Sequence, residues 1–245
     1  DPAGSEDPAR AAEQLVRMDP CFLCLRIPDE LPATVPAGAG SDWTPAAAAG
    51  SVTFGSCNAV QKLNGQVIEL WANLVKQVPG ARLLLKAANL REPALRERIR
   101  AKFIAAGLAA EQIEVVGPLE GRGDHLALYR RIDVALDPFP YNGTTTTCDA
   151  LLMGAPVVTL AGKVHASRVG ASLLHAVGHG EWVAGDVQQY VSIAAGLAAD
   201  RPLLARLRTQ LRDQVQGSVL CDGPAFGRRM SEVIRQEWKK RACLV

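Results

Sequence analysis

The most informative segment of this chain is Asp137-Pro-Phe-Pro-Tyr-Asn-Gly-Thr-Thr-Thr-Thr-Cys-Asp149. It follows a short apolar run, 134–136, and precedes a second apolar run that begins at residue 150. This order predicts a buried strand, a Pro/Gly turn and a helix that opens with threonines. A helix N-terminus presents free backbone N–H groups and a positive dipole end, and threonine hydroxyls can cap it or bind an anion. The segment therefore predicts a site for a phosphorylated ligand, with nucleoside diphosphates as the leading candidates. The residues that would form it are Thr144, Thr145 and Thr146, with Asn142 and Gly143 as further candidates.

The composition limits the class of protein. The 245 residues suffice for one large domain, and an apolar content of 48% suffices for a sizeable core. A formal net charge of +2 gives no reason to expect nucleic acid or an acidic membrane surface as a partner. No apolar run is long enough to span a bilayer, and the start of the chain does not resemble a signal peptide. Scattered cysteines favour a reducing, cytoplasmic compartment.

Two of the six cysteines, Cys21 and Cys24, have the CxxC spacing of zinc and redox sites. No second pair of cysteines or histidines has a matching spacing in the sequence. We therefore interpret the two cysteines as apolar residues of a packed segment, and we predict no metal site.

From residue 51 onward, short apolar runs alternate with segments of helical spacing. Apolar runs without alternation are typical of strands buried on both faces of a parallel sheet. The predicted fold class is a doubly wound α/β domain with a Rossmann-like parallel sheet. The expected strands are 52–54, 83–85, 113–116, 134–136 and 156–160, and the expected helices are 65–78, 93–106, 124–131, 146–153, 166–176, 187–199, 202–216 and 224–240.

The chain divides into three expected parts. Residues 1–50 are rich in Ala, Pro, Gly and Asp, with little periodicity, and are typical of a linker. Residues 51–222 form the expected ligand-binding domain, and residues 223–245 form a C-terminal helix. Such a loose beginning suggests a chain that is part of something longer.

Two lysines follow predicted strands, and ligands of doubly wound sheets bind beyond the carboxyl ends of the strands. Lys62 comes soon after the first strand, and Lys86 follows the second strand directly. Because the charge of Lys62 opposes the dipole of the following helix, we favour a ligand contact over a solvated lysine. The position of Lys86 is equally compatible with a contact to a ligand and with a contact to a buried side chain of the chain itself.

Four more candidates follow later strands. Arg122 and His125 lie in the loop after 113–116, where His125 is either a contact for a base or ribose or a packed histidine. Asp149 either accepts hydrogen bonds from a ribose, holds the loop, or only favours the helix dipole. Arg168 begins a later helix and would pair with phosphate or with Asp149.

Several common motifs are absent from the sequence. It has no GxGxxG after the first strand, which argues against a dinucleotide dehydrogenase, and neither a Walker lysine loop nor a GxSxG elbow. From the residues alone, the sequence predicts a parallel α/β domain that binds a phosphorylated ligand at its strand ends.

Four segments, in their order along the chain, resemble one enzyme family. They are Val52-Thr-Phe-Gly-Ser-Cys-Asn58 with the later Lys62, Leu70-Trp-Ala-Asn-Leu-Val-Lys-Gln-Val-Pro79, Asp133-Val-Ala-Leu-Asp137 with the segment quoted first, and Met153-Gly-Ala-Pro-Val-Val-Thr159 with the later Ala166-Ser-Arg-Val169. Over residues 50 to 240, the chain resembles the C-terminal catalytic lobe of O-linked N-acetylglucosamine transferases, glycosyltransferase family 41, of the bacterial type. The resemblance implies one Rossmann-like lobe of a two-lobed GT-B glycosyltransferase.

The resemblance also implies an activity, the inverting transfer of N-acetylglucosamine from UDP-N-acetylglucosamine to serine or threonine of acceptor proteins. It implies no cofactor and no metal, and a cation opposite the departing diphosphate supplies the electrostatic stabilisation instead. By resemblance, Lys62 is the catalytic residue that contacts the diphosphate and stabilises the leaving UDP. Thr145–Thr146 would hold phosphate, Asp149 would bind the ribose hydroxyls, and Arg122 and His125 would lie beside the uracil and ribose.

Family members carry an N-terminal lobe and tetratricopeptide repeats before this region. These parts supply a histidine near the acceptor and the groove that holds the acceptor polypeptide, and neither is in this chain. We therefore expect the chain to be the donor-binding lobe, with residues 1–50 as a remnant of the region between the lobes. The helix at 223–245 is expected to pack back on the N-terminal lobe.

The chain departs from the family pattern at a few positions. Many relatives have histidine at Thr144, glutamine at Ala59 and arginine at Leu128, and Arg122 replaces a lysine, which keeps the charge but changes its geometry. Two alternatives therefore stay open. The first is a related protein glucosyl- or fucosyltransferase, the latter using a GDP-sugar, and the second is a non-catalytic nucleotide-binding domain.

Overall fold

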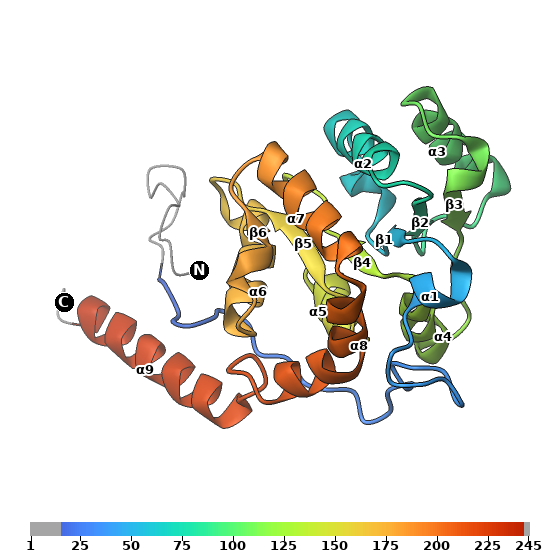
Figure 1. The fold of residues 1–245 in the computed structure, drawn as a ribbon. Coiled ribbons are helices and arrows are strands. Elements are labelled where there is room, and N and C mark those ends of the chain that lie inside the picture. Colours follow the sequence, from blue (N-terminus) through green and yellow to red (C-terminus); the bar gives the residue numbers. More distant parts are fainter. Residues whose placement is uncertain (1–15, 243–245) are drawn as a thin grey trace.

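The computed structural model describes residues 16–242, and a parallel sheet forms the centre of this part of the chain (Figure 1). Its six strands lie in the order β3-β2-β1-β4-β5-β6. They are β1 (Thr53–Ser56), β2 (Arg82–Lys86), β3 (Ile113–Val116), β4 (Val134–Leu136), β5 (Val157–Leu160) and β6 (Val183–Ala184). Every neighbouring pair is parallel, with Phe54 opposite both Leu83 and Val134.

Helices cover the sheet in two groups. Helix α2 (Gly65–Gln77) contacts α3 (Pro93–Ala105) and α7 (Val187–Ala199), whereas α5 (Thr145–Leu152) contacts α6 (Val169–Ala176) and α8 (Arg201–Gln216). The chain moves from β1 toward one edge of the sheet and from β4 toward the other edge. Because the crossovers between parallel strands are right-handed, the two sets of helices lie on opposite faces of the sheet. The predicted doubly wound, Rossmann-like fold class is confirmed.

Helix α2 illustrates how the sequence sets these elements. The Asn64 side chain caps its N-terminus by accepting a hydrogen bond from the Val67 amide at 3.0 Å. Its buried face includes Leu70, Trp71 and Leu74, at helical spacing. The Trp71 indole N–H donates to the Tyr190 hydroxyl of α7 at 3.2 Å, which ties the two helices together.

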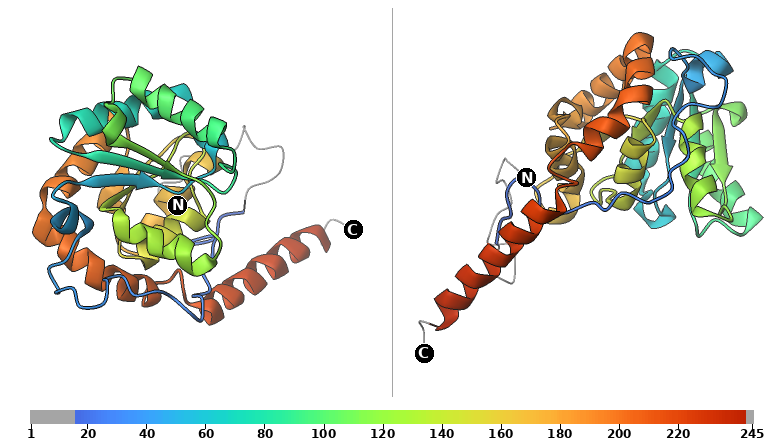
Figure 2. Two further views of the ribbon diagram at one scale, coloured as in Figure 1. Left: turned by 90° about the vertical axis from the view of Figure 1, so that its right-hand side faces the viewer. Right: turned by 90° about the horizontal axis from the view of Figure 1, so that it is seen from below.

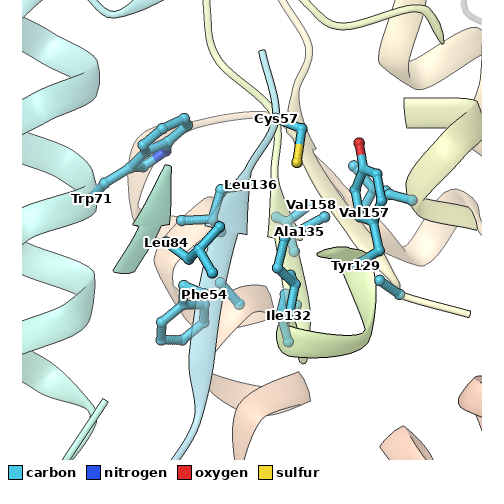
Figure 3. Packing of buried hydrophobic residues seen from close by; sticks show 14 of the residues in the cluster. Phe54, Cys57, Trp71, Leu84, Tyr129, Ile132, Ala135, Leu136, Val157 and Val158 are labelled. Atoms are coloured by element: carbon cyan, nitrogen blue, oxygen red, sulfur yellow. The ribbon is translucent and has the colours of Figure 1, made fainter. Parts of the chain in front are cut away.

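The core lies between the sheet and these helices (Figure 3). Side chains of β1, β2, β4 and β5 meet there without polar alternation, as expected for strands covered on both faces. A Cβ added at Gly55 would lie 2.5 Å from the Ile132 side chain. A larger residue at this position of β1 would therefore force Ile132 to move. The labelled core residues are Phe54, Cys57, Trp71, Leu84, Tyr129, Ile132, Ala135, Leu136, Val157 and Val158.

Two buried charged side chains, Asp133 and Arg208, stabilise the end of the sheet where the strands β1 and β4 begin. The Asp133 carboxylate accepts the backbone N–H of Ala46 at 2.9 Å and that of Thr53 at 2.8 Å, which ties helix α1 (Pro45–Ala49) to β1. The Arg208 guanidinium of α8 donates to the carbonyls of Met153, Tyr129 and Ile132. Both groups have a structural role that the sequence pattern did not predict.

The structure also differs from the predicted elements. Strand β6 and helix α1 were not predicted, because Val183–Ala184 is too short a run and Pro45–Ala49 is one turn of alanines. The expected helix 124–131 is α4 (Arg122–Ala127) followed by a 3₁₀ turn, and the expected helix 166–176 starts only at Val169.

The segment from residue 16 to residue 50 runs along the domain, and its Leu25 amide donates to the Leu220 carbonyl at 2.7 Å. Cys21 is buried and Cys24 is exposed, and both are free thiols. Within residues 16–242 no group of three or more His, Cys, Asp or Glu side chains has the arrangement of a metal site.

Helix α9 (Gly223–Ala242) projects away from the sheet and its helices (Figures 1 and 2). None of its twenty residues is buried, and Ile234 and Trp238 are 60% and 73% exposed. In the part of the chain that the structure describes, no helix is both long and apolar enough to cross a membrane.

Candidate functional site

The strand order places a topological switch between β1 and β4. The connections that follow β1 and β4 lead to opposite sides of the sheet, and such a point leaves a crevice beyond the carboxyl ends of the strands. The segments that follow β1, β2 and β4 are 57–62, 87–92 and 137–144, and the predicted candidates lie on or near them.

The turn after β4 is built from buried polar contacts. The Gly143 amide donates to the Asp137 carboxylate at 2.6 Å, and the Asn142 side-chain amide donates to the Pro138 carbonyl at 3.1 Å. A Cβ on Gly143 would lie 2.5 Å from the Thr146 hydroxyl and 3.0 Å from the Asn58 side-chain oxygen. The close approach of these groups explains why a glycine occupies the turn.

The N-terminus of α5 opens directly from this turn. Thr144 occupies the N-cap position, but within residues 16–242 no side chain caps the first turn. The Thr146 hydroxyl donates to the Asn58 side-chain oxygen at 3.0 Å, and Thr145 is exposed. The first backbone N–H groups of α5 therefore lack a side-chain partner, which suits an anion.

Lys62 follows β1 and is held against the same turn. Its ammonium donates to the Asn142 carbonyl at 2.7 Å and to the Asn58 side-chain oxygen at 3.4 Å. It also lies 4.1 Å from the centre of the exposed Tyr141 ring. Burial lowers the pKa of Lys62, and the charge of Asp137 acts in the opposite direction. A cation thus lies against the turn that leads into α5.

A second polar group centres on Asp149, in the next turn of α5. Its carboxylate accepts a two-pronged contact from Arg122, at 2.9 Å and 2.5 Å, and a third from His125 Nε2 at 3.2 Å. The Lys86 ammonium approaches His125 Nδ1 at 3.1 Å. Because an ammonium can only donate, Nδ1 accepts from Lys86 and Nε2 donates to Asp149. Lys86 therefore sets the orientation and the tautomer of the His125 ring.

The two charged partners Asp149 and Arg122 differ in their exposure to solvent. Asp149 is 3% exposed at its side chain, whereas the Arg122 side chain is 49% exposed. Burial by itself raises the pKa of Asp149, but the hydrogen bonds from His125 and Arg122 outweigh burial and hold the pKa below its usual value. The hydrogen bond to Asp149 likewise raises the pKa of Arg122. The carboxylate is thus ionised and already paired.

A cavity of about 400 Å³ lies between these groups. Six of the predicted site residues line it, together with residues of the turns after β1 and β2. The lining residues are Cys57, Ala59, Gln61, Lys86, Ala88, Asn89, Arg122, His125, Thr145, Thr146 and Asp149. The volume is in the range of small-molecule pockets.

The other predicted residues do not line this cavity. Lys62 and Thr146 both donate to the side-chain oxygen of Asn58, which connects Lys62 to the cavity wall. Arg168 donates to the Gly162 carbonyl at 3.0 Å. The Asp149 carboxylate contacts Arg122 and His125, and the predicted pairing of Arg168 with Asp149 is not among its contacts in the described residues. Of the remaining three, Asn142 and Gly143 form the turn and Thr144 stands at the N-cap.

Two residues that shape the candidate site received no role from the sequence, Asn58 and Asp137. Asp137 follows β4 directly and Asn58 is the second residue after β1, and a place just beyond a strand end is the signal that points to them. Asn58 joins Lys62 to Thr146, and Asp137 holds Gly143.

A second cavity, of about 320 Å³, lies at the amino ends of β1 and β2, beside Trp43, Thr53 and Arg82. Ligands of doubly wound sheets bind at the opposite, carboxyl ends. We therefore assign the candidate site to the cavity beside Asp149.

Residues 40–230 match the family model described as glycosyl transferase family 41. This chain belongs to that family. It is 39% identical, over 94% of its length, to the Arabidopsis thaliana protein named "Probable UDP-N-acetylglucosamine--peptide N-acetylglucosaminyltransferase SPINDLY". The chain spans 24% of the length of that relative.

Solved structures support the same family-41 fold. A mutant form of the Thermobaculum terrenum O-GlcNAc transferase is 35% identical, with a TM-score of 0.79 over 93% of this chain and 42% of that one. Sucrose-phosphate synthase of Thermosynechococcus elongatus, at 21% identity, has a TM-score of 0.54 over 80% of this chain and 49% of its own, a likeness of fold alone. The predicted family resemblance and the GT-B lobe fold are confirmed.

Proposed function

We propose that this chain is the donor-binding lobe of an inverting protein glycosyltransferase that takes UDP-N-acetylglucosamine, needs no metal and modifies serine or threonine. The observation that carries the proposal is the cavity at the switch point, where cationic groups, a helix N-terminus and one buried carboxylate converge. The names of the family-41 relatives supply the chemistry of donor and acceptor.

The cavity offers one contact for each part of the donor. The free N–H groups of α5, with Thr145 and Thr146, suit the diphosphate. The ionised and fixed Asp149 carboxylate suits the ribose hydroxyls, because a hydrogen bond to a charged acceptor is stronger than one to a neutral acceptor. Arg122 and His125, beside Asp149, would then lie at the ribose and base, and Lys86 would fix the ring of His125.

Lys62 is the proposed catalytic residue. During transfer, the bond between the anomeric carbon and the β-phosphate oxygen breaks, and negative charge grows on the departing diphosphate. An ammonium that a carbonyl and an amide oxygen already hold in place stabilises this charge without reorganisation. Inversion follows if the acceptor oxygen bonds to the anomeric carbon on the face opposite UDP while its proton passes to a base of the acceptor site. The acceptor site would come from the N-terminal lobe.

Helix α9 is proposed to pack on that lobe. Phe226, Met230, Ile234 and Trp238 recur at four-residue spacing and so share one side of a helix that buries nothing in this chain. The other proposed partners are the tetratricopeptide repeats and the acceptor proteins. Free thiols at Cys21 and Cys24 favour a cytoplasmic location.

Calorimetric titration of this chain with UDP, in the presence of EDTA, tests the proposal. Micromolar binding of UDP with much weaker binding of GDP supports the proposed donor. Preference for GDP would favour transfer from a GDP-sugar instead, and loss of UDP binding in EDTA would contradict independence from metal. Absence of binding to either nucleotide would contradict a donor-binding lobe.

Two histidine variants locate the bound nucleotide. His125→Ala removes the hydrogen bond to Asp149 and should lower UDP affinity about tenfold. The matched control is His175→Ala on α6, an exposed position outside the cavity, which should leave UDP affinity unchanged. Equal affinities of the two variants would place the nucleotide elsewhere.

A further inference from the structure

The carboxylate of Asp137 is closed in on all sides at the end of β4. It is 1% exposed, and it accepts the Thr159 hydroxyl at 2.7 Å and the Gly143 amide at 2.6 Å. A Cβ on Gly170 of α6 would lie 2.6 Å from its second oxygen. Burial of an ionised carboxylate costs free energy, and the hydrogen bonds from Thr159 and Gly143 offset part of this cost.

These contacts shape the anion-binding turn. Asp137 holds the amide of Gly143, the residue after Asn142, and the Asn142 carbonyl in turn holds the Lys62 ammonium. The Tyr190 hydroxyl, itself bonded to Trp71, donates to the Asp137 carbonyl at 3.2 Å and anchors the strand end from α7. The position of the turn and that of Lys62 thus both depend on the strand end at Asp137.

We propose that Asp137 is a positioning residue for the diphosphate of the proposed donor, which holds the Gly143 turn in its anion-binding shape and takes up a proton from solvent when the diphosphate binds. The proposal rests on the proposed function, because it assigns the proposed diphosphate to this turn.

The electrostatics of the pocket supply the proton uptake. Two titratable groups face Asp137, Lys62 from the segment after β1 and Tyr190 from α7. Burial raises the pKa of Asp137 to about 7, against the hydrogen bonds from Thr159 and Gly143 and the charge of Lys62. A bound diphosphate adds negative charge beside this group, which disfavours the ionised carboxylate further. Diphosphate binding should therefore weaken as pH rises through neutrality.

The test compares UDP affinities of matched variants at about pH 6.5 and about pH 8.5 by calorimetry. The ionisation of UDP itself, near pH 6, is common to all variants and cancels in the comparison. Asp137→Asn keeps an oxygen for Gly143, so it should bind UDP but lose the part of the pH dependence that comes from the carboxylate, up to about tenfold per unit of pKa shift. Asp137→Ala leaves the amide without an acceptor and should bind about tenfold more weakly at both pH values.

Asp133→Asn is the matched control, since Asp133 is equally buried at the other end of β4 and its carboxylate also accepts two hydrogen bonds, both from backbone amides. It should keep the wild-type pH dependence. An Asp137→Asn variant with the wild-type dependence, or an Asp137→Ala variant with the wild-type affinity, would overturn the proposal.

A nuclear magnetic resonance titration separates failure of this proposal from failure of the proposed function. The Gly143 amide proton should shift as Asp137 titrates near pH 7 in the wild type, and the shift should vanish in Asp137→Asn. If UDP does not bind the wild type although this shift is present, the proposed function fails and Asp137 only shapes the turn. If the shift is absent, Asp137 does not take up a proton in this pH range and the inference fails by itself.

Discussion

Replacement of Asp149 by Asn should weaken UDP binding about tenfold. A carboxylate offers about four acceptor positions, and Arg122 and His125 take three of them in the structure. One position remains for a ribose hydroxyl, unless Arg122 swings away. A hydrogen bond to a charged acceptor contributes about 1.5–3 kcal/mol, and each 1.4 kcal/mol is a factor of ten in affinity.

The same substitution should also lower the free energy of unfolding. The amide of Asn turns a donor toward Arg122 or His125, so one of their hydrogen bonds is lost. Because half of the Arg122 side chain is exposed and water can replace its partner, we expect a loss of only about 1–2 kcal/mol. Denaturant unfolding measures this loss, and calorimetry with UDP measures affinity separately.

Asp186→Asn provides the control for both measurements. Asp186 caps α7 by accepting the Gln189 amide at 2.8 Å, away from the cavity. Its replacement should cost less than about 1 kcal/mol of stability and leave UDP affinity unchanged. An Asp149→Asn variant that binds UDP as tightly as the wild type would remove Asp149 from the donor site and refute the reasoning.

Three further perturbations test other parts of the site. Lys62→Ala in the full-length protein should reduce transfer at least about a hundredfold while UDP still binds, and Lys76→Ala, a surface control, should change neither in an enzyme assay. Gly143→Ala should cost about 1–3 kcal/mol of unfolding free energy and weaken UDP binding, whereas Gly227→Ala, which meets nothing, should not. Because folding lowers the pKa of Asp149, the ionised carboxylate stabilises the fold above about pH 4, and this stabilisation is lost as the pH falls. The free energy of unfolding, measured against pH, should therefore fall more steeply in acid for the wild type than for Asp149→Asn.

The sequence predicted most of the fold because its strands are apolar runs between turn residues. Five of the six strands were expected within a residue or two of their bounds. The edge strand β6 was missed because two residues, Val183 and Ala184, carry no periodicity. Its pairing with β5 is decided by tertiary packing.

The candidate site could be predicted as a set of positions but not as a set of contacts. The rule for strand ends identified Lys86 and His125, yet it could not show that the two touch each other. Whether Asp149 pairs with Arg122 or with Arg168 depends on where α4 lies, and local sequence does not encode that placement. The role of Asp137 was also hidden, because an acid after a strand looks the same whether it faces water or a buried turn.

The junction between β1 and β4 has a consequence for how the chain folds. Lys62 bonds to Asn142, 80 positions away, and Thr146 bonds to Asn58, 88 positions away. Such distant pairings close late, since long loops must be ordered before these contacts form. A partly folded chain that has completed only its first three strands would hold Lys62 but no anion-binding turn. Competence to bind nucleotide should therefore appear only at the final step of refolding, and nucleotide would stabilise the native state alone.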